Sequence, residues 1–417
     1  MGFVFNYNRD VSSDLIPMRW PGEWTDPLIV DRVGETPVNC LIFDASLPEV
    51  IAARAKEKGL AVFQSGKAPG VIQVKGEWPG VRVSQGQSRA AVDAGPTGAP
   101  WIDSNGWRVR LEQTQRPGVP VWVDATPPKF LRRNAYLLAL ADAAMHGGQW
   151  IITIDSDLAR GLLAEEPAAQ QTSDKVLGLI RFFRAHKAWG SFKPVAAVAV
   201  VSDFSGDNEL IGHETLNLTA RTHQPFLIIE KAEFAATPLS GVKAIIYPDG
   251  DAPAPEIRRR LLTFVEAGGL LIIGPKWGLA DGRPSTEEHP RFSIRLAGKG
   301  RVAVSKEDIG EPYMLASDAR ILFSYRSDIL RFWNAGSMGS YYTQSPDGKT
   351  ALVQLANYAT EPARFPATMW IRGTFRAARF FDPAKTEPEP LKLLPKSGGT
   401  ELHLPPVAAY AAIELDI

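Results

Sequence analysis

Short apolar runs alternate with helical patterns along the first part of the chain, residues 1–192. Residues 41–43, 60–63, 119–123 and 150–154 are read as strands, with helical periodicity between them. This alternation is typical of βα units, which build a parallel sheet because each helix returns the chain to the same edge. The segment is shorter than the about 250 residues of a full (β/α)8 barrel. The pattern therefore predicts a barrel-like domain that is incomplete or irregular.

A second unit begins with a continuous apolar run at residues 195–201. The run is too apolar for an exposed strand, which predicts a central parallel strand buried on both faces. A strand at 242–248, a helix at 255–267 and a strand at 270–275 follow. This order predicts a doubly wound, flavodoxin-like α/β domain over residues 193–290.

Helical periodicity fades from residue 291 to the end at 417. Short alternating segments such as 351–355 and 377–381 appear instead, separated by Gly, Pro and Asp, and they favour a small β-sandwich. The chain is therefore predicted to be a multidomain α/β protein. Its predicted domains are 1–192, 193–290 and 291–417.

Positive and negative side chains balance, since Lys plus Arg and Asp plus Glu each number 46. A chain without net charge has no general attraction for phosphate backbones or anionic lipid, so nucleic acid and membrane are not expected as partners. No apolar run approaches the roughly 20 residues of a membrane span. No signal peptide is visible at the start, although an exported chain with its signal removed would read the same.

The cysteine and histidine content argues against a metal or another cofactor. The single cysteine, Cys40, lies in an apolar strand pattern and is predicted to be a buried, inert core residue. His, Cys and Asp nowhere recur at the spacing of metal ligands. We therefore predict no metal and no cofactor.

Residues 241–248, with the helical segment 256–269, resemble the class I glutamine amidotransferase-like domain found in barrel glycoside hydrolases. They are most similar to the trimerisation domain of family 42 β-galactosidases. The resemblance covers residues 193–290. The order of barrel, amidotransferase-like domain and small β domain is also similar across the whole length. The resemblance implies a carbohydrate substrate and a homo-oligomer.

Two features of the chain depart from the families that it resembles. Amidotransferases use a nucleophilic cysteine, and residues 193–290 contain none, so that chemistry is absent and the domain is expected to be structural or oligomerising. The Asn-Glu pair that usually carries the acid and base in such barrels is not found in the barrel-like segment.

Aspartates follow several of the predicted barrel strands, namely Asp44, Asp103, Asp124 and Asp155, with Asp157 two residues beyond the last. The carboxyl ends of barrel strands meet at one mouth, where catalytic groups lie. Glycoside hydrolysis requires two carboxylates about 5–9 Å apart. An aspartate after a strand also caps helices and forms turns, so this reading stays open for each one. We predict Asp103 and Asp155 as the catalytic pair.

Two indoles flank a carboxylate and a carboxamide within residues 100–107. Aromatic faces pack against the apolar faces of sugars while Asp and Asn bind hydroxyl groups, although tryptophans are also frequent in cores. A second Glu-Trp pair and the polar loop after residue 201 extend this pattern. The predicted substrate-binding residues are Glu77, Trp78, Trp101, Asn105, Trp107, Asp124, Asp157 and Asp203.

The leading hypothesis is a glycoside hydrolase-like protein that acts on an oligosaccharide or glycoside through paired carboxylates at the barrel mouth. The alternative is a non-catalytic carbohydrate-binding or scaffold protein that retains a hydrolase architecture. The geometry of the carboxylates distinguishes the two, because a binding protein has no need of two acids that face each other across a pocket.

Overall fold

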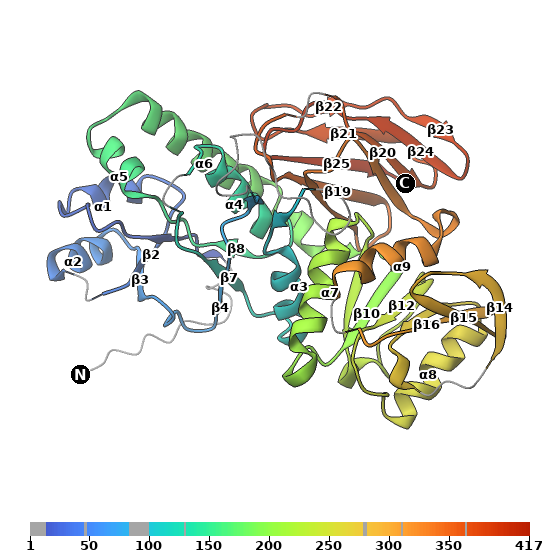
Figure 1. Ribbon diagram of the computed structural model, residues 1–417. Helices are drawn as coiled ribbons and strands as arrows, with labels where there is room; N and C mark the ends of the chain where they lie inside the picture. The colour runs from blue at the N-terminus through green and yellow to red at the C-terminus, as the bar shows by residue number, and fades with distance from the viewer. Residues whose placement is uncertain are drawn as a thin grey trace, which may run out of the picture.

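The computed structural model describes residues 14–45, 48–82, 100–128, 131–277, 282–309, 312–362 and 365–417. The start of the chain, where a signal peptide would lie, falls outside the described residues. Within the described ranges, no helix has both the length and the apolar character needed to span a membrane. The protein is a mixed α/β structure, as predicted, with helices packed on several sheets (Figure 1).

Six parallel strands organise the N-terminal unit. The three-stranded sheets β1-β2-β3 and β4-β7-β8 are joined by a parallel bridge between Met18 and Ile152, so the strand order is β3-β2-β1-β8-β7-β4. This is the order of successive barrel strands, without a hydrogen-bonded β3–β4 pair among the described residues. The strands are β1 (Pro17–Arg19), β2 (Cys40–Phe43), β3 (Ala61–Gln64), β4 (Ile72–Lys75), β7 (Val121–Asp124) and β8 (Gln149–Trp150).

Helices and one short hairpin complete this unit. The helices are α1 (Ile29–Gly34), α2 (Glu49–Glu57), α3 (Gly106–Gln115), α4 (Ala135–Ala144), α5 (Ser156–Leu163), α6 (Pro167–Ala185) and the 3-10 turn η2 (Lys187–Ser191). All residues of β2 are buried, and burial raises the pKa of the Cys40 thiol to about 12. A thiol with so high a pKa is inert, and the prediction of a buried core cysteine is confirmed.

The strand that carries Asp103 is not one of the parallel strands, which corrects the prediction. It is β6 (Ile102–Asp103), which pairs antiparallel with β5 (Gly80–Val81). The physical reason is its pairing: the backbone of β6 forms its strand hydrogen bonds with β5, whereas β8, which also has two residues, pairs in parallel with β7. Asp155 also lies beyond its strand, because β8 ends at Trp150 and α5 begins at Ser156.

The middle unit is a seven-stranded sheet in the order β11-β10-β12-β13-β16-β15-β14. Its central strand β10 is buried at every position and pairs in parallel with β11 and β12, which confirms the prediction for the apolar run. The elements are β10 (Val198–Ser202), η3 (Gly206–Asn208), α7 (Glu209–Arg221), β11 (Phe226–Glu230), η4 (Lys231–Glu233), β12 (Ala244–Tyr247), α8 (Pro255–Glu266), β13 (Leu270–Ile273), η5 (Pro275–Trp277), β14 (Arg283–Glu288), β15 (Phe292–Ala297) and β16 (Gly300–Ser305).

This sheet continues past residue 290, where the sequence predicted a domain boundary. Strand β16 pairs in parallel with β13, and β15 and β14 extend the sheet in antiparallel fashion. The fading of helical periodicity therefore marks a change from parallel to antiparallel pairing within one sheet. Three short helices follow: η6 (Pro312–Met314), α9 (Leu315–Phe323) and η7 (Tyr325–Ser327).

The C-terminal unit consists of two antiparallel sheets that share one apolar core. One sheet has the order β17-β20-β24-β23 and the other β22-β21-β25-β19-β18-β9. The strands are β9 (Lys193–Pro194), β17 (Leu330–Trp333), β18 (Met338–Gln344), β19 (Thr350–Asn357), β20 (Thr368–Arg372), β21 (Ala377–Phe381), β22 (Glu389–Pro390), β23 (Leu394–Lys396), β24 (Gly399–His403) and β25 (Tyr410–Asp416).

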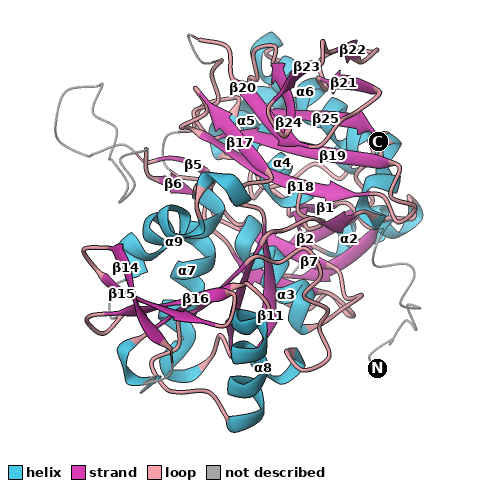
Figure 2. Ribbon diagram, turned by 90° about the vertical axis from the view of Figure 1, so that its right-hand side faces the viewer, coloured by secondary structure: helices cyan, strands magenta, loops and turns pink. Residues whose placement is uncertain are grey.

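The three units pack against one another around α3, α4 and α7 (Figures 1 and 2). Helix α3 contacts α7 of the middle unit, and α4 contacts β19 of the C-terminal unit. Gln354 donates a hydrogen bond of 3.1 Å from its Nε2 to the carbonyl oxygen of Met145 across the second contact. Side chains from all three units therefore meet beside the hairpin β5–β6.

Candidate functional site

Glu77 and Asp103 come together beside the carboxyl end of β4. Strand β4 ends at Lys75, and Gly76 then passes close to β7, where an added Cβ would lie 2.4 Å from Cγ1 of Val123. Only glycine fits this approach, which places Glu77 directly after the strand. Asp103 reaches the same place from β6, and the two carboxyl groups are close enough to share a hydrogen bond.

The pKa of Glu77 is raised above its ordinary value of 4.5. Partial burial is the largest cause, and the charge of Asp103 is the next. The guanidinium groups of Arg82 and Arg108 act in the opposite direction. A carboxyl group that keeps its proton to higher pH beside a second carboxylate is suited to donate a proton, as in a general acid.

Two arginines that the sequence analysis did not select flank this carboxyl pair. Arg82 binds Asp103 at 2.5 Å through Nη2, and its Cζ lies 5.1 Å from the ring centroid of Trp101. Arg221, at the end of α7, lies 4.2 Å from the same centroid. Among the described residues, no acceptor meets Nε or Nη1 of Arg221, and both atoms are buried. Both donors are thus enclosed by the protein, with the guanidinium group stacked over Trp101.

A buried aspartate holds the loop that carries Glu77. Asn105 accepts a hydrogen bond from the backbone N–H of Glu77 at 2.8 Å and donates one to its carbonyl oxygen at 2.9 Å. Asp142, on α4, accepts from the backbone N–H and from Nδ2 of Asn105 at 2.8 and 3.0 Å. It also accepts from the Tyr358 hydroxyl at 2.5 Å. Asn105, predicted to bind substrate, is buried and positions the loop instead.

Burial raises the pKa of the Asp142 carboxyl, while the hydrogen bonds from Tyr358 and Asn105 oppose that rise. Asp142 is fully buried, so these three donors are its compensation for lost water. The set connects the N-terminal unit to the C-terminal unit through Tyr358. It fixes the backbone that presents Glu77 to solvent.

A second polar cluster lies at the carboxyl ends of β1, β2 and β7. Arg19 binds both carboxylate oxygens of Asp124 at 2.6 Å through Nη2 and forms an ion pair with Asp44. Gln73 of β4 donates a further hydrogen bond of 2.8 Å to Asp124. Asp124 thus lies at the predicted edge of the parallel strands, with its charge paired by Arg19.

Asp155 caps helix α5. Among the described residues, it has no recorded contact with Asp103. Its carboxylate accepts a hydrogen bond of 2.7 Å from the backbone N–H of Leu158. The backbone N–H of Asp155 donates a hydrogen bond of 3.2 Å to the hydroxyl oxygen of Tyr136. Asp157 is exposed and pairs with Arg160 at 2.5 Å. Both aspartates thus have a local role on α5.

We expect Asp155→Asn to leave both stability and any activity nearly unchanged, because asparagine caps a helix about as well as aspartate. Asp155→Ala is expected to lower the free energy of unfolding by about 1 kcal/mol through loss of the cap. Urea unfolding of the two variants measures the difference. Equal destabilisation by both, or loss of turnover in the Asn variant, would show that the carboxylate itself is needed.

The remaining predicted binding residues lie apart from the carboxyl pair. Trp78 packs edge-on against Tyr136 and Trp150, with ring centroids 5.7 and 5.1 Å away. Trp107, on α3, contacts His213 of α7 at 5.2 Å and packs against the core of the middle unit. Both indoles serve packing in this structure, and Trp101 alone of the three tryptophans lies beside the pair.

Asp203 belongs to a polar cluster at the carboxyl edge of the middle sheet. Lys231 binds Asp203 at 2.6 Å and the fully buried Asp249 at 2.7 Å. Ser202 donates a hydrogen bond of 2.5 Å to Asp249, whose pKa is raised by burial. The cluster lies where the strand order reverses between β10 and β12. The ion-pair partner of Asp203 therefore belongs to the middle sheet and not to the site around Glu77.

Metal ligation receives no support from the side chains that are described. Within those ranges, no group of three or more His, Cys, Asp or Glu residues is arranged to hold a metal ion. Arg221 and Tyr358 were missed because they come from distant parts of the chain, whereas Arg82 directly follows β5. The only local signal was the Arg82 position close to the hairpin, which the sequence analysis did not recognise.

No protein-family model matches the sequence, and no curated protein matches it. Solved structures of similar fold do match. An α-L-fucosidase, isoenzyme 2, from Paenibacillus thiaminolyticus is similar at a TM-score of 0.53 and 12% identity, over 98% of this chain and 85% of that chain. A β-galactosidase from Bacillus circulans sp. alkalophilus is similar at a TM-score of 0.50 and 10% identity, over 90% and 63%.

The chain has a glycoside hydrolase-like fold. A GH42 β-galactosidase from G. stearothermophilus also matches, at a TM-score of 0.48 and 12% identity, over 88% of this chain and 66% of that chain. The chain spans about two thirds of the length of the two β-galactosidases. The sequence-based resemblance to barrel glycoside hydrolases is confirmed at the level of the fold. The activities in these names are those of the other proteins.

Proposed function

We propose that this protein is a glycoside hydrolase-like enzyme whose saccharide site is formed by Glu77, Asp103 and the arginines beside them. The juxtaposition of Glu77 and Asp103 carries the proposal, because partial burial and then the charge of Asp103 raise the pKa of Glu77. Glu77 then acts as the general acid that protonates the glycosidic oxygen.

The carboxyl pair is too close to provide both groups of the reaction. Hydrogen-bonded carboxyls lie nearer than the about 5–9 Å that separates the two carboxylates of glycoside hydrolases. We assign the second role to Asp124, whose Cα pairs with that of Lys75, two residues before Glu77. Arg19 holds Asp124 in a fixed orientation. This replaces the predicted Asp103–Asp155 pair.

At the level of architecture, we propose that the N-terminal unit is a reduced barrel and that the middle unit is an amidotransferase-like module without chemistry of its own. The C-terminal sheets are assigned as a β-sandwich. No finding tests the predicted homo-oligomer, which stays a prediction.

A non-catalytic saccharide-binding protein is the second candidate function. The ion pairs favour this function. Arg82 binds Asp103 and Arg19 binds Asp124, so each of these two carboxylates already has a cationic partner. Such pairing stabilises a binding site but lowers the reactivity expected of a nucleophile.

A panel of aryl glycosides and oligosaccharides separates the two functions. The enzyme is expected to release the aryl group from at least one α-L-fucoside or β-galactoside, the glycosides named for the two similar structures. A binding protein would instead show heat on titration with an oligosaccharide but no release. The absence of both turnover and binding across the panel would contradict the saccharide site altogether.

A further inference from the structure

A cavity of about 430 Å³ lies at the opposite edge of the middle sheet from Asp203 and Asp249. Its lining residues come from the points where β12, β13 and β16 begin, and these parallel strands all begin at the same edge. Phe323 and Ser327, at the ends of α9 and η7, close it from the other side. We call it the basic cavity.

Four cationic side chains line the basic cavity: Lys243, Arg283, Lys299 and Arg301. No Asp or Glu is among the described residues that line it. Arg301 is held by Glu287 at 2.5 Å and by the carbonyl oxygen of Leu322 at 2.7 Å. The other three have no ion-pair partner within the described ranges. The cavity is therefore strongly positive.

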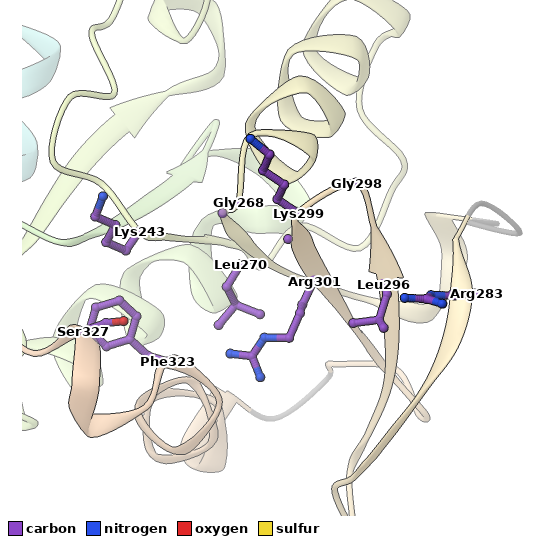
Figure 3. A pocket seen from close by; sticks show the side chains of 12 residues that line it. Lys243, Gly268, Leu270, Arg283, Leu296, Gly298, Lys299, Arg301, Phe323 and Ser327 are labelled. Atoms are coloured by element: carbon purple, nitrogen blue, oxygen red, sulfur yellow. The ribbon is translucent and has the colours of Figure 1, made fainter.

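The backbone is closely packed at one wall of the basic cavity. An added Cβ at Gly300 would lie 2.1 Å from the carbonyl oxygen of Val265 and 2.3 Å from that of Gly269, so no side chain can occupy this position. Figure 3 shows Arg301 beside Leu270 in the middle of the cavity, with Lys243 on one side and Arg283 on the other. A ligand there would lie between these cationic side chains.

We propose that the basic cavity binds a small molecule that carries a tetrahedral oxyanion, a phosphate or sulfate ester on a sugar-sized body. The volume is within the about 300–1,000 Å³ of small-molecule sites. Charge-assisted hydrogen bonds from lysine and arginine are the usual recognition of such groups. Leu296, which is partly exposed, offers an apolar contact to the sugar ring. This site is separate from Glu77 and independent of the proposed hydrolysis.

Calorimetric titration of the full chain with inorganic phosphate, inorganic sulfate, glucose 6-phosphate, glucose 6-sulfate and glucose tests the proposal. The charged sugars are expected to bind more tightly than the inorganic ions, and glucose is expected not to bind at this site. Lowering the pH from 7.5 to 5.5 distinguishes the two esters. A phosphate loses its second charge near pH 6, so its binding weakens, whereas sulfate binding is unchanged.

The double variant Lys243→Ala/Lys299→Ala is expected to weaken binding of either ester by about tenfold or more, since two charge-assisted contacts are lost. Both side chains are exposed, so the melting temperature without ligand should stay the same. The matched control is Lys349→Ala, which removes a cation that is 80% exposed from the C-terminal unit and should change binding less than about twofold. Glu77→Gln should leave anion binding intact.

Three results would overturn the proposal. The first is that none of the four anions binds at about 10 mM in low salt, where screening is weakest. The second is unchanged affinity in the double variant. The third is an equal loss in Lys349→Ala, which would show a general effect of surface charge.

Discussion

Glu77→Gln is expected to lower kcat/KM on the responsive glycoside by about 10²–10⁴-fold, the usual contribution of a general acid. Glutamine keeps the size and the backbone hydrogen bonds to Asn105 but cannot deliver a proton. Because Glu77 is exposed, the melting temperature should change little. Steady-state kinetics on an aryl glycoside, together with thermal unfolding, measure both effects.

Two further variants support the interpretation of that result. Asp157→Asn changes an exposed aspartate on α5 and should retain full activity. Asp103→Asn removes a charge that raises the pKa of Glu77, so the pKa falls and the acid loses its proton at lower pH. The alkaline limb of the kcat/KM profile should then move to lower pH.

Full activity of Glu77→Gln on a substrate with a poor leaving group would exclude Glu77 as the acid.

Local patterns in the sequence were sufficient for the elements whose burial is uniform. The run that became β10 is buried at all positions, and such a run fits only a central strand. Strand β13 likewise follows a helix at a glycine pair, as the turn signals indicate. Both predictions depended on residues that are adjacent in the chain.

Long-range pairing could not be predicted in the same way. Strand β15 alternates in polarity as in a separate β domain, but it pairs with β16, which joins β13 of the preceding sheet. Asp155 and Asp124 each follow a strand, yet only the structure separates a helix cap from a carboxylate bound by arginine. The periodicity of apolar residues indicates which positions are buried, but it does not indicate which two strands pair.

The site shows the same limitation. Glu77, Trp101 and Asp103 were selected from their residue types and do lie together. Arg221 reaches them from the end of α7, and no spacing rule connects it to the hairpin. Asp142 was not considered in the sequence analysis. It lies in the middle of an apolar helix, and nothing near it in the sequence indicates its partner Tyr358, which directly follows β19.

Asp142→Ala is expected to lower the free energy of unfolding by about 2–5 kcal/mol, the largest stability effect that we predict. The change leaves the backbone N–H and Nδ2 of Asn105 and the Tyr358 hydroxyl without their acceptor in a buried place. Tyr358→Phe removes one donor and leaves the other two paired, so it should cost about 1–2 kcal/mol. Urea unfolding monitored by tryptophan fluorescence gives both values.

The same experiment tests whether Asp142 positions the loop of Glu77. Asn105 would lose its anchor in Asp142→Ala, so saccharide affinity should fall together with stability, whereas Tyr358→Phe should keep most of the affinity. The exposed control Asp157→Ala should change stability by no more than about 0.5 kcal/mol. If Asp142→Ala were as stable as that control, the buried hydrogen bonds would not hold the loop, and the positioning role of Asp142 would be wrong.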